Sequence, residues 1–278
     1  MEEVTKVVSE NNVLVGLRTN DGYIIEAVYT ISAGCLCLST QVGCKTGCVF
    51  CASGNKGYIR NLSADEIMEQ YRYFEDRNYE ISSINFAGIG EPLLNIDNVL
   101  EFRNNINIAN IQVTTSLPNA ESFHKILDGE FDSIIISLHS ADNVTRKRIM
   151  PNSLSVTQID EILHNAIAQD ENLKNVIRIS YSLFNGLNTE YNERLKIIEF
   201  AKKHDLKILL MKYNEVNNKP QYCIDEETYL ITIKMIEDYG VECEDCVYTG
   251  NRKCECCKGS ASRCDPVGGC GTLFIKYS

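Results

Sequence analysis

Three closely spaced cysteines are the residues of this sequence best suited to chemistry. Cys44, Cys48 and Cys51 are separated by three and then two intervening residues, so their thiolates can surround one compact centre. Three thiolates suit an iron–sulfur cube that keeps one iron open for a small-molecule ligand. The same three residues also fit a structural zinc site that a fourth ligand completes elsewhere in the chain. The spacing alone leaves both interpretations open.

A glycine-rich turn with a Glu-Pro pair follows the next predicted strand. It reads Gly88-Ile89-Gly90-Glu91-Pro92. Glycine lets the backbone approach a ligand closely, and a rigid Glu-Pro at a strand end can present carbonyl groups and a carboxylate to an ammonium group. Such a turn is by itself more often only a turn, but its position after the cysteine loop makes it a candidate binding element.

The elements that must position these residues alternate between strands and helices. Residues 13–18 and 23–30 alternate apolar and polar around a turn, which predicts a β-hairpin. A short strand is expected to carry Cys35 and Cys37 into the cysteine loop. Further strands are expected at 83–87, 112–115, 133–138, 176–183 and 207–211, with helical patterns between them. This order predicts an α/β fold with a parallel sheet, whose chemistry lies at the carboxyl ends of the strands. The cysteine loop and the Glu-Pro turn both follow such strand ends.

The apolar runs and the cysteines of the sequence indicate the cellular compartment and the kind of chemistry to expect. No apolar run reaches the length of a membrane span and no signal-peptide pattern opens the chain, so we expect a cytoplasmic protein without membrane contact. In that setting, 13 cysteines indicate metal or thiol chemistry rather than disulfides. Five cysteines lie at 35–51 and seven at 243–270, while Cys223 stands alone. The middle of the chain is therefore expected to serve as scaffold.

The charge of the chain bears on its partners. The net charge is −11 among 278 residues. A nucleic-acid binder usually carries a basic stripe, because neutralising phosphates supplies most of its affinity. Here the basic clusters are small, and Arg146-Lys147-Arg148 is interpreted as a solvated surface. The charge counts against a large RNA substrate without excluding one.

Four motifs, taken in order, resemble the RlmN/Cfr family of radical S-adenosylmethionine (SAM) methyltransferases. They are CLSTQVGC at 37–44, GIGEPLLN at 88–95, ISLH at 136–139 and DPVGGCGTL at 265–273. The family methylates carbon 2 or 8 of an adenine in large-subunit ribosomal RNA. The resemblance runs from about residue 12 to the C-terminus and implies a partial (β/α)6 radical SAM barrel. We therefore expect an N-terminal β-hairpin extension at 1–34, a radical SAM core at 35–240 and a Cys-rich segment at 241–278.

The resemblance implies two cofactors and a two-cysteine mechanism. Cys44, Cys48 and Cys51 match the ligands of a [4Fe–4S] cluster whose open iron binds SAM. Cys270 matches the cysteine that first takes a methyl group from one SAM. A second SAM, cleaved reductively at the cluster, gives a 5′-deoxyadenosyl radical that removes hydrogen from this methyl, and the carbon radical adds to the ring. Cys37 matches the partner that takes the proton and releases the product by forming a disulfide with Cys270.

Other positions match residues around SAM and the substrate. Glu26, on the second hairpin strand, matches a carboxylate near the substrate base, although the turn between it and Cys37 is about two residues shorter than in the family. Ser and Asn side chains can bond a carboxylate or a ribose, and the backbone near His139 can meet an adenine. For the His139 side chain itself, a structural role at the rim is an equal alternative. The expected SAM-binding residues are Gly90, Glu91, Ser116, Ser137, Leu138, His139 and Asn214.

Two departures from the family pattern stand out. The family's N-terminal RNA-binding domain has no counterpart in this sequence. Extra cysteines precede Cys270, and a zinc ion or a second iron–sulfur cluster would fold this apolar-poor segment. The candidate ligands of this second site are Cys243, Cys246, Cys254, Cys256, Cys257 and Cys264.

Three functions are therefore compared. The first is methylation of an adenosine in ribosomal or transfer RNA, with an electron donor such as flavodoxin or ferredoxin. The second is a radical SAM enzyme that modifies a small heterocycle, nucleotide or peptide, in which the C-terminal cysteines bind a second metal. The third, a non-catalytic zinc-binding protein, requires the ordered motifs to be coincidence.

Overall fold

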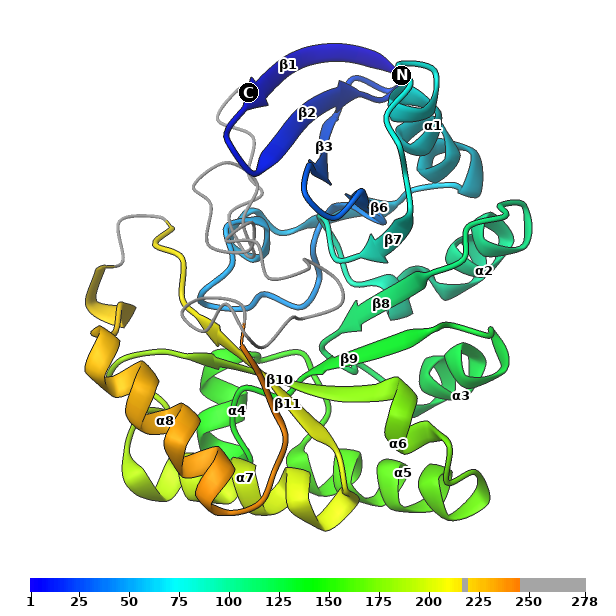
Figure 1. The fold of residues 1–278 in the computed structure, drawn as a ribbon. Helices are drawn as coiled ribbons and strands as arrows, with labels where there is room; N and C mark the ends of the chain where they lie inside the picture. The colour runs from blue at the N-terminus through cyan, green and yellow to red at the C-terminus, as the bar shows by residue number, and fades with distance from the viewer. Residues whose placement is uncertain (217–219, 246–278) are drawn as a thin grey trace.

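One ten-stranded sheet organises the part of the chain that the computed structural model describes, residues 1–216 and 220–245. The strands lie in the order β1-β2-β3-β4-β7-β8-β9-β10-β11-β12, and the sheet curves around a central space (Figure 1). Their bounds are β1 (Glu2–Val8), β2 (Asn12–Arg18), β3 (Ile24–Thr30), β4 (Cys35–Cys37), β7 (Ser83–Phe86), β8 (Ile111–Thr115), β9 (Ser133–Ser137), β10 (Ile177–Leu183), β11 (Lys207–Lys212) and β12 (Cys243–Asp245). A separate two-stranded sheet pairs β5 (Gln41–Gly43) with β6 (Tyr58–Asn61).

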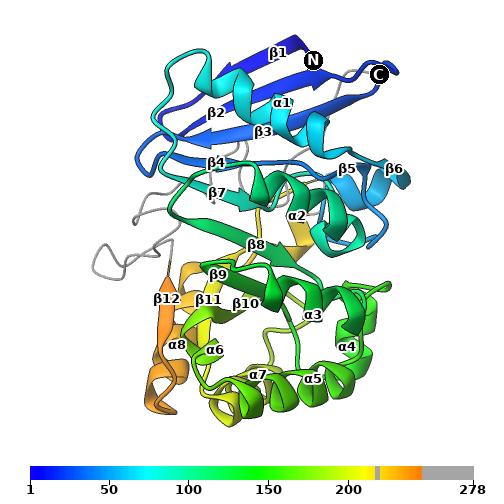
Figure 2. The ribbon, with the colours of Figure 1, turned by 90° about the vertical axis from the view of Figure 1, so that its right-hand side faces the viewer.

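The direction of strand pairing in the ten-stranded sheet changes at β4. Strands β1 to β4 pair antiparallel, whereas every pairing from β4 through β12 is parallel. Figure 2 shows the antiparallel strands continuing directly into the parallel ones. The parallel part is an open barrel, which confirms the α/β partial-barrel fold expected from the sequence.

Helices cover the convex side of the parallel strands (Figure 1). Their bounds are α1 (Ala64–Glu75), α2 (Ile96–Asn104), α3 (Ala120–Asp128), α4 (Asn143–Ile149), α5 (Val156–Gln169), α6 (Leu173–Val176), α7 (Tyr191–His204) and α8 (Glu226–Asp238). The start of α1 is fixed by a capping box, in which the Ser63 side chain accepts from the backbone N–H of Glu66 and the Glu66 side chain accepts from that of Ser63. This pattern is visible in the sequence and predicts the helix start correctly.

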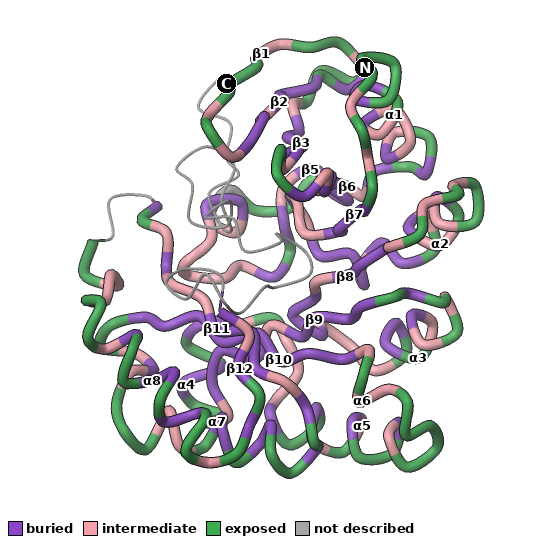
Figure 3. Tube along the Cα trace, viewed as in Figure 1, coloured by how far each residue is buried: buried purple, intermediate pink, exposed green. Residues whose placement is uncertain are grey.

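The hydrophobic core lies between the sheet and these helices. All seven residues of β10 are buried, as expected for a parallel strand that is covered on both faces. Figure 3 shows burial concentrated in the central strands, with exposed residues along β1 and the outer helix surfaces. No helix in the described ranges has the length and apolar content needed to cross a membrane.

Four strands were not expected from the sequence, and they are β1, β5, β6 and β12. β1 is an edge strand with no fully buried residue, so its sequence lacks the apolar alternation that marks a half-buried strand. β12 has only three residues and pairs with β11, which is too short for a periodic signal. The sheet thus continues to Asp245, past the boundary at residue 240 that the sequence suggested.

Candidate active site

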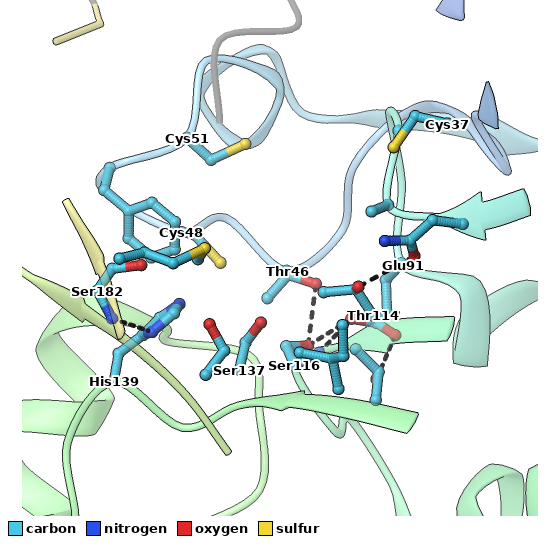
Figure 4. Close-up of a pocket in the computed structure, with 18 of the residues that line it drawn as sticks. Cys37, Thr46, Cys48, Cys51, Glu91, Thr114, Ser116, Ser137, His139 and Ser182 are labelled. Atoms are coloured by element: carbon cyan, nitrogen blue, oxygen red, sulfur yellow. Dashed lines mark hydrogen bonds between the residues drawn. The ribbon is translucent and has the colours of Figure 1, made fainter. Parts of the chain in front are cut away.

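A cavity opens on the concave side of the sheet, at the carboxyl ends of the parallel strands. Its volume is about 200 Å³. Strands β7 to β11 and the loops that follow them contribute residues to its wall, as does the loop between β5 and β6. Side chains from these elements converge in Figure 4. The lining includes Cys35, Cys37, Cys44, Cys48, Phe50, Cys51, Gly90, Glu91, Ser116, Ser137, His139, Phe184 and Asn214.

The three clustered cysteines occupy one backbone loop whose shape depends on glycine. The Cys44 N–H donates to the carbonyl of Gly57 at 2.9 Å, which closes the loop across its base. Gly43 has φ +74°, and a Cβ there would lie 2.1 Å from the Gly57 oxygen. A side chain at position 43 is therefore excluded by both conformation and space. The loop thus places Cys44, Cys48 and Cys51 in the wall of the cavity.

Burial controls the ionisation of these thiols. Removal from water raises the pKa of Cys44 to about 11 and also raises the pKa of Cys48. Without a bound cation, both side chains stay protonated at neutral pH. Bound iron supplies the positive charge that lowers thiol pKa values and holds the thiolates in place. Within residues 1–216 and 220–245, no three Cys, His, Asp or Glu side chains lie close enough together to hold one metal ion.

Glu91 is fully engaged by neighbouring donors. Its Oε2 accepts from the backbone N–H and the hydroxyl of Ser116 at 2.8 and 2.7 Å. Its Oε1 accepts from the Thr115 hydroxyl at 2.6 Å and the Leu93 N–H at 3.1 Å. Burial raises the pKa of this carboxyl, and the four donors act in the opposite direction. The carboxylate therefore joins the end of β8 to the Glu-Pro turn.

The turn itself brings backbone close to the cavity. Gly90 has φ +114°, and a Cβ there would lie 2.7 Å from the side chains of Thr40 and Gln41. The Glu91 N–H donates to Oε1 of Gln41 at 3.0 Å. A larger residue at position 90 would displace the segment that leads into the cysteine loop, so glycine is required there.

His139 is a buried, neutral side chain held at the cavity wall. Its Nδ1 accepts from the Ser182 N–H at 3.1 Å (Figure 4), which assigns the ring proton to Nε2. Burial lowers the pKa of His139 to about 3. The ring lies edge-on to Phe50 and Phe184, which stack on each other with centroids 4.7 Å apart. This group of rings makes an apolar wall of the kind that packs against a planar base.

Cys37 also lines the cavity, and in Figure 4 it lies on the right, whereas Cys48 and Cys51 lie on the left. It shares one face of β4 with Cys35, two residues earlier, and both line the cavity. Glu26 is buried on β3 and does not line the cavity; its carbonyl accepts from the Ser39 hydroxyl at 2.5 Å. The spacing of Cys35 and Cys37 on a predicted strand was the signal that could have identified Cys35 from the sequence.

The structure corrects some of the sequence interpretations, and others concern residues that it does not describe. The Leu138 side chain packs in the hydrophobic core rather than in the cavity wall. Arg146 is 1% exposed, so it does not belong to a solvated basic surface. Cys243 packs in the core on β12, where burial raises the pKa of its thiol to about 12, as burial also raises that of Cys44, and its role as a metal ligand stays a prediction. Cys246, Cys254, Cys256, Cys257, Cys264 and Cys270 lie outside the described residues.

Comparison with known proteins decides the family. A family model described as the radical SAM superfamily matches residues 38–201. The chain belongs to the radical SAM superfamily. Members of this superfamily carry a [4Fe–4S] cluster and SAM, and three cysteines in one cavity wall, beside a glycine turn and polar strand ends, fit that pair of cofactors.

Relatives within the superfamily confirm the RlmN/Cfr-like character of this radical SAM protein. A probable dual-specificity RNA methyltransferase RlmN of Chlorobaculum tepidum is 32% identical over 216 residues, covering 72% of this chain and 58% of the relative. One of Chlorobium phaeobacteroides is 32% identical over 246 residues, with coverages of 81% and 66%. The chain thus spans about three-fifths of the length of these relatives.

Solved structures agree on the fold of this radical SAM protein. A radical SAM methyltransferase from Sphaerobacter thermophilus superposes with a TM-score of 0.76 at 22% identity, covering 88% of this chain and 76% of that one.

Proposed function

We propose that this radical SAM protein methylates a ring carbon of an adenine base in RNA. The observation that carries the proposal is the placement of Cys37 in the same cavity as Cys44, Cys48 and Cys51. A thiol therefore faces the space where radical chemistry takes place. The naming of the relatives as RNA methyltransferases supports the substrate class.

The cavity residues have distinct proposed roles. The cluster on the three loop cysteines, with SAM on its open iron, supplies a 5′-deoxyadenosyl radical. The turn at Gly90 and Glu91 presents backbone to the amino group of SAM. Side chains that line the cavity can bond its carboxylate and ribose hydroxyls; these are Ser116, Ser137 and Asn214. The Phe50 and Phe184 rings beside His139 offer a flat surface to its adenine.

Two cysteines carry the methyl transfer in this proposal. The Cys270 thiolate takes a methyl group from a first SAM and becomes a thioether. A 5′-deoxyadenosyl radical would then remove one hydrogen atom from this methyl group, and the resulting carbon radical would add to the ring. The adduct radical would lose one electron to the oxidised cluster and its ring proton to Cys37. Attack of the Cys37 thiolate on the Cys270 sulfur would then break the carbon–sulfur bond and form the disulfide, while the released carbon takes up a proton to become the methyl group of the product. A dithiol reductant then restores both thiols. Glu26 is proposed as a partner of the base, because it lies on the same face of β3 as Val28, which lines the cavity.

The C-terminal segment is proposed to hold a second metal. The described chain ends at Asp245, at the carboxyl end of β12 and beside β11. β11 leads into Lys212 and Asn214 of the cavity wall. A zinc ion or a second cluster on ligands drawn from Cys243, Cys246, Cys254, Cys256 or Cys257, and Cys264 would order the segment that contains Cys270.

The net charge supports a second candidate, a radical SAM enzyme that modifies a small molecule, nucleotide or peptide. At −11, the chain lacks the overall basic character that favours binding to phosphate backbones. The discriminating experiment is SAM cleavage under dithionite with ribosomal RNA, transfer RNA, free adenosine nucleotides and no substrate. Methylation that occurs only with RNA as the substrate supports the first candidate. Turnover that occurs only with a free nucleotide contradicts it.

The test of the methyl-carrier mechanism is peptide mass spectrometry of Cys270 in anaerobically purified protein. One added methyl group is expected, and it should be absent when Cys44 is replaced by alanine or SAM is withheld. An unmodified Cys270 in protein that cleaves SAM would refute methyl transfer through cysteine. The electron donor is proposed to be a flavodoxin or ferredoxin, and the reaction is proposed to take place in the cytoplasm.

A further inference from the structure

Arg146 is a buried cation behind the wall of the cavity. It lies on α4 and is among the largest fully buried side chains of the described residues. Its guanidinium makes four hydrogen bonds, and every acceptor is a backbone carbonyl. Nη2 donates to Ser116 at 2.7 Å, Nη1 to Ser137 at 2.8 Å and to Leu138 at 2.6 Å, and Nε to Leu154 at 2.9 Å.

Neutral carbonyls satisfy its donors but do not neutralise its charge. Burial lowers the pKa of Arg146 to about 10, which still leaves it protonated at neutral pH. The groups that act against this shift are Cys48 and Glu91. A buried charge that is hydrogen-bonded only to carbonyls is strongly unfavourable unless negative charge lies nearby. The anionic groups of the cavity are therefore the natural counter-charge of Arg146.

The hydrogen bonds of Arg146 end on residues that form the cavity wall. Ser116 and Ser137 line the cavity at the ends of β8 and β9, and Leu138 immediately precedes His139. Ser116 is held twice, since Glu91 accepts from its N–H and hydroxyl while Arg146 donates to its carbonyl. One arginine thus fixes two neighbouring strand ends relative to each other.

We propose that Arg146 is a positioning residue for the SAM site and the buried counter-ion of its negative groups. It holds the strand ends that contact SAM, and its charge favours binding of the SAM carboxylate and the more negative, reduced state of the cluster. The inference rests on the cofactors of the radical SAM superfamily and does not depend on RNA methylation. The charge of Arg146 and the geometry of its hydrogen bonds make separable contributions to SAM binding and to the state of the cluster.

Two substitutions separate these contributions in cluster-loaded protein. Arg146→Met keeps an apolar stem and removes both the charge and the bonds, whereas Arg146→Lys keeps the charge but loses the planar fork that reaches four carbonyls. Arg148→Met is the matched control, because Arg148 is an exposed cation on the same helix. The measurements are the dissociation constant for SAM, and the midpoint potential of the cluster from a redox titration followed by electron paramagnetic resonance.

We expect Arg146→Met to weaken SAM binding at least tenfold and to shift the midpoint potential to a more negative value. Arg146→Lys should weaken SAM binding by a smaller factor and leave the potential near that of the wild type. Arg148→Met should change neither. Wild-type SAM affinity and potential in Arg146→Met, or a potential shift of equal size in Arg146→Lys, would overturn the proposal. If Arg146→Met does not retain its cluster, the potential of Arg146→Lys alone decides the charge effect.

Discussion

The backbone N–H of Ser182 donates to Nδ1 of His139 at 3.1 Å, and this bond fixes the tautomer of a histidine in the cavity wall. His139 has φ +56°, a left-handed conformation that few residues other than glycine and asparagine adopt readily. Its carbonyl accepts from the Asn188 amide at 2.7 Å, and the same amide donates to the Ser182 carbonyl at 2.8 Å. Hydrogen bonds thus hold both the backbone carbonyl of His139 and the Nδ1 atom of its ring.

We predict that His139 makes the protein sensitive to acid. Its pKa falls from 6.5 in the unfolded chain to about 3 in the native state. Between these values the unfolded chain binds a proton that the native state does not, so stability falls as the pH drops below 6.5. The loss from pH 7 to pH 5 should be about 2 kcal/mol, measured by urea unfolding. His139→Asn keeps an acceptor for Ser182 and tolerates the backbone conformation, and it should remove this part of the pH dependence; an unchanged profile would contradict the prediction.

Replacing Cys44 with alanine should abolish cluster binding and SAM cleavage. Two thiolates cannot hold a cluster that three protein ligands normally support. The measurement is iron content and visible absorbance after anaerobic reconstitution, followed by 5′-deoxyadenosine formation under dithionite. Cys223→Ala is the matched control because Cys223 does not line the cavity, and it should retain both properties. A Cys44→Ala protein with full iron content and SAM cleavage would exclude this loop as the cluster site.

Glu91→Gln should destabilise the protein although the substitution is nearly isosteric. The carboxylate accepts four hydrogen bonds, whereas an amide must place an N–H₂ group against two of those donors. Leaving buried donors without an acceptor costs about 1–3 kcal/mol. Denaturant unfolding of the two proteins measures this difference, and SAM affinity should fall in parallel. Equal stability at neutral pH would mean that the wild-type carboxyl is protonated and already donates one bond.

Cys37 and Cys35 provide a matched pair for the proposed release step. They share one face of β4 and one cavity. Cys37→Ala should accumulate a covalent adduct between Cys270 and the substrate, because nothing then takes the proton and displaces the sulfur. Cys35→Ala should turn over without an adduct. Intact-protein mass spectrometry after a single turnover distinguishes the two variants, and an adduct in Cys35→Ala alone would exchange the proposed roles of the two thiols.

The barrel and most of the cavity were predictable because their signals are local. Buried parallel strands such as β10 appear as apolar runs, and the turn that ends at Glu91 requires glycine whatever surrounds it. The motif residues follow strands whose ends meet at one edge, so their convergence follows from topology.

Arg146 was misjudged, and the strand that carries Cys243 was missed, because their environments are created by tertiary structure. A basic triplet normally indicates a solvated helix, and only the packing of α4 shows that Arg146 faces inward beside Ile149 and Thr145. Cys243 belongs to a strand of three residues that exists because β11 offers it an edge. In both cases the neighbours are distant in the sequence and carry no local signal.

β4 has three residues, yet in the described part of the sheet it alone pairs with both the antiparallel strands and the parallel barrel. Its register pairs Cys37 with Val28 of β3 on one side and with Asn85 of β7 on the other. Movement of strands β1 to β3 relative to the barrel would therefore strain the backbone that carries Cys37. The thiol that we propose to be reactive lies where the two parts of the sheet meet, so a contact made on the outer strands would change how far its sulfur extends into the cavity.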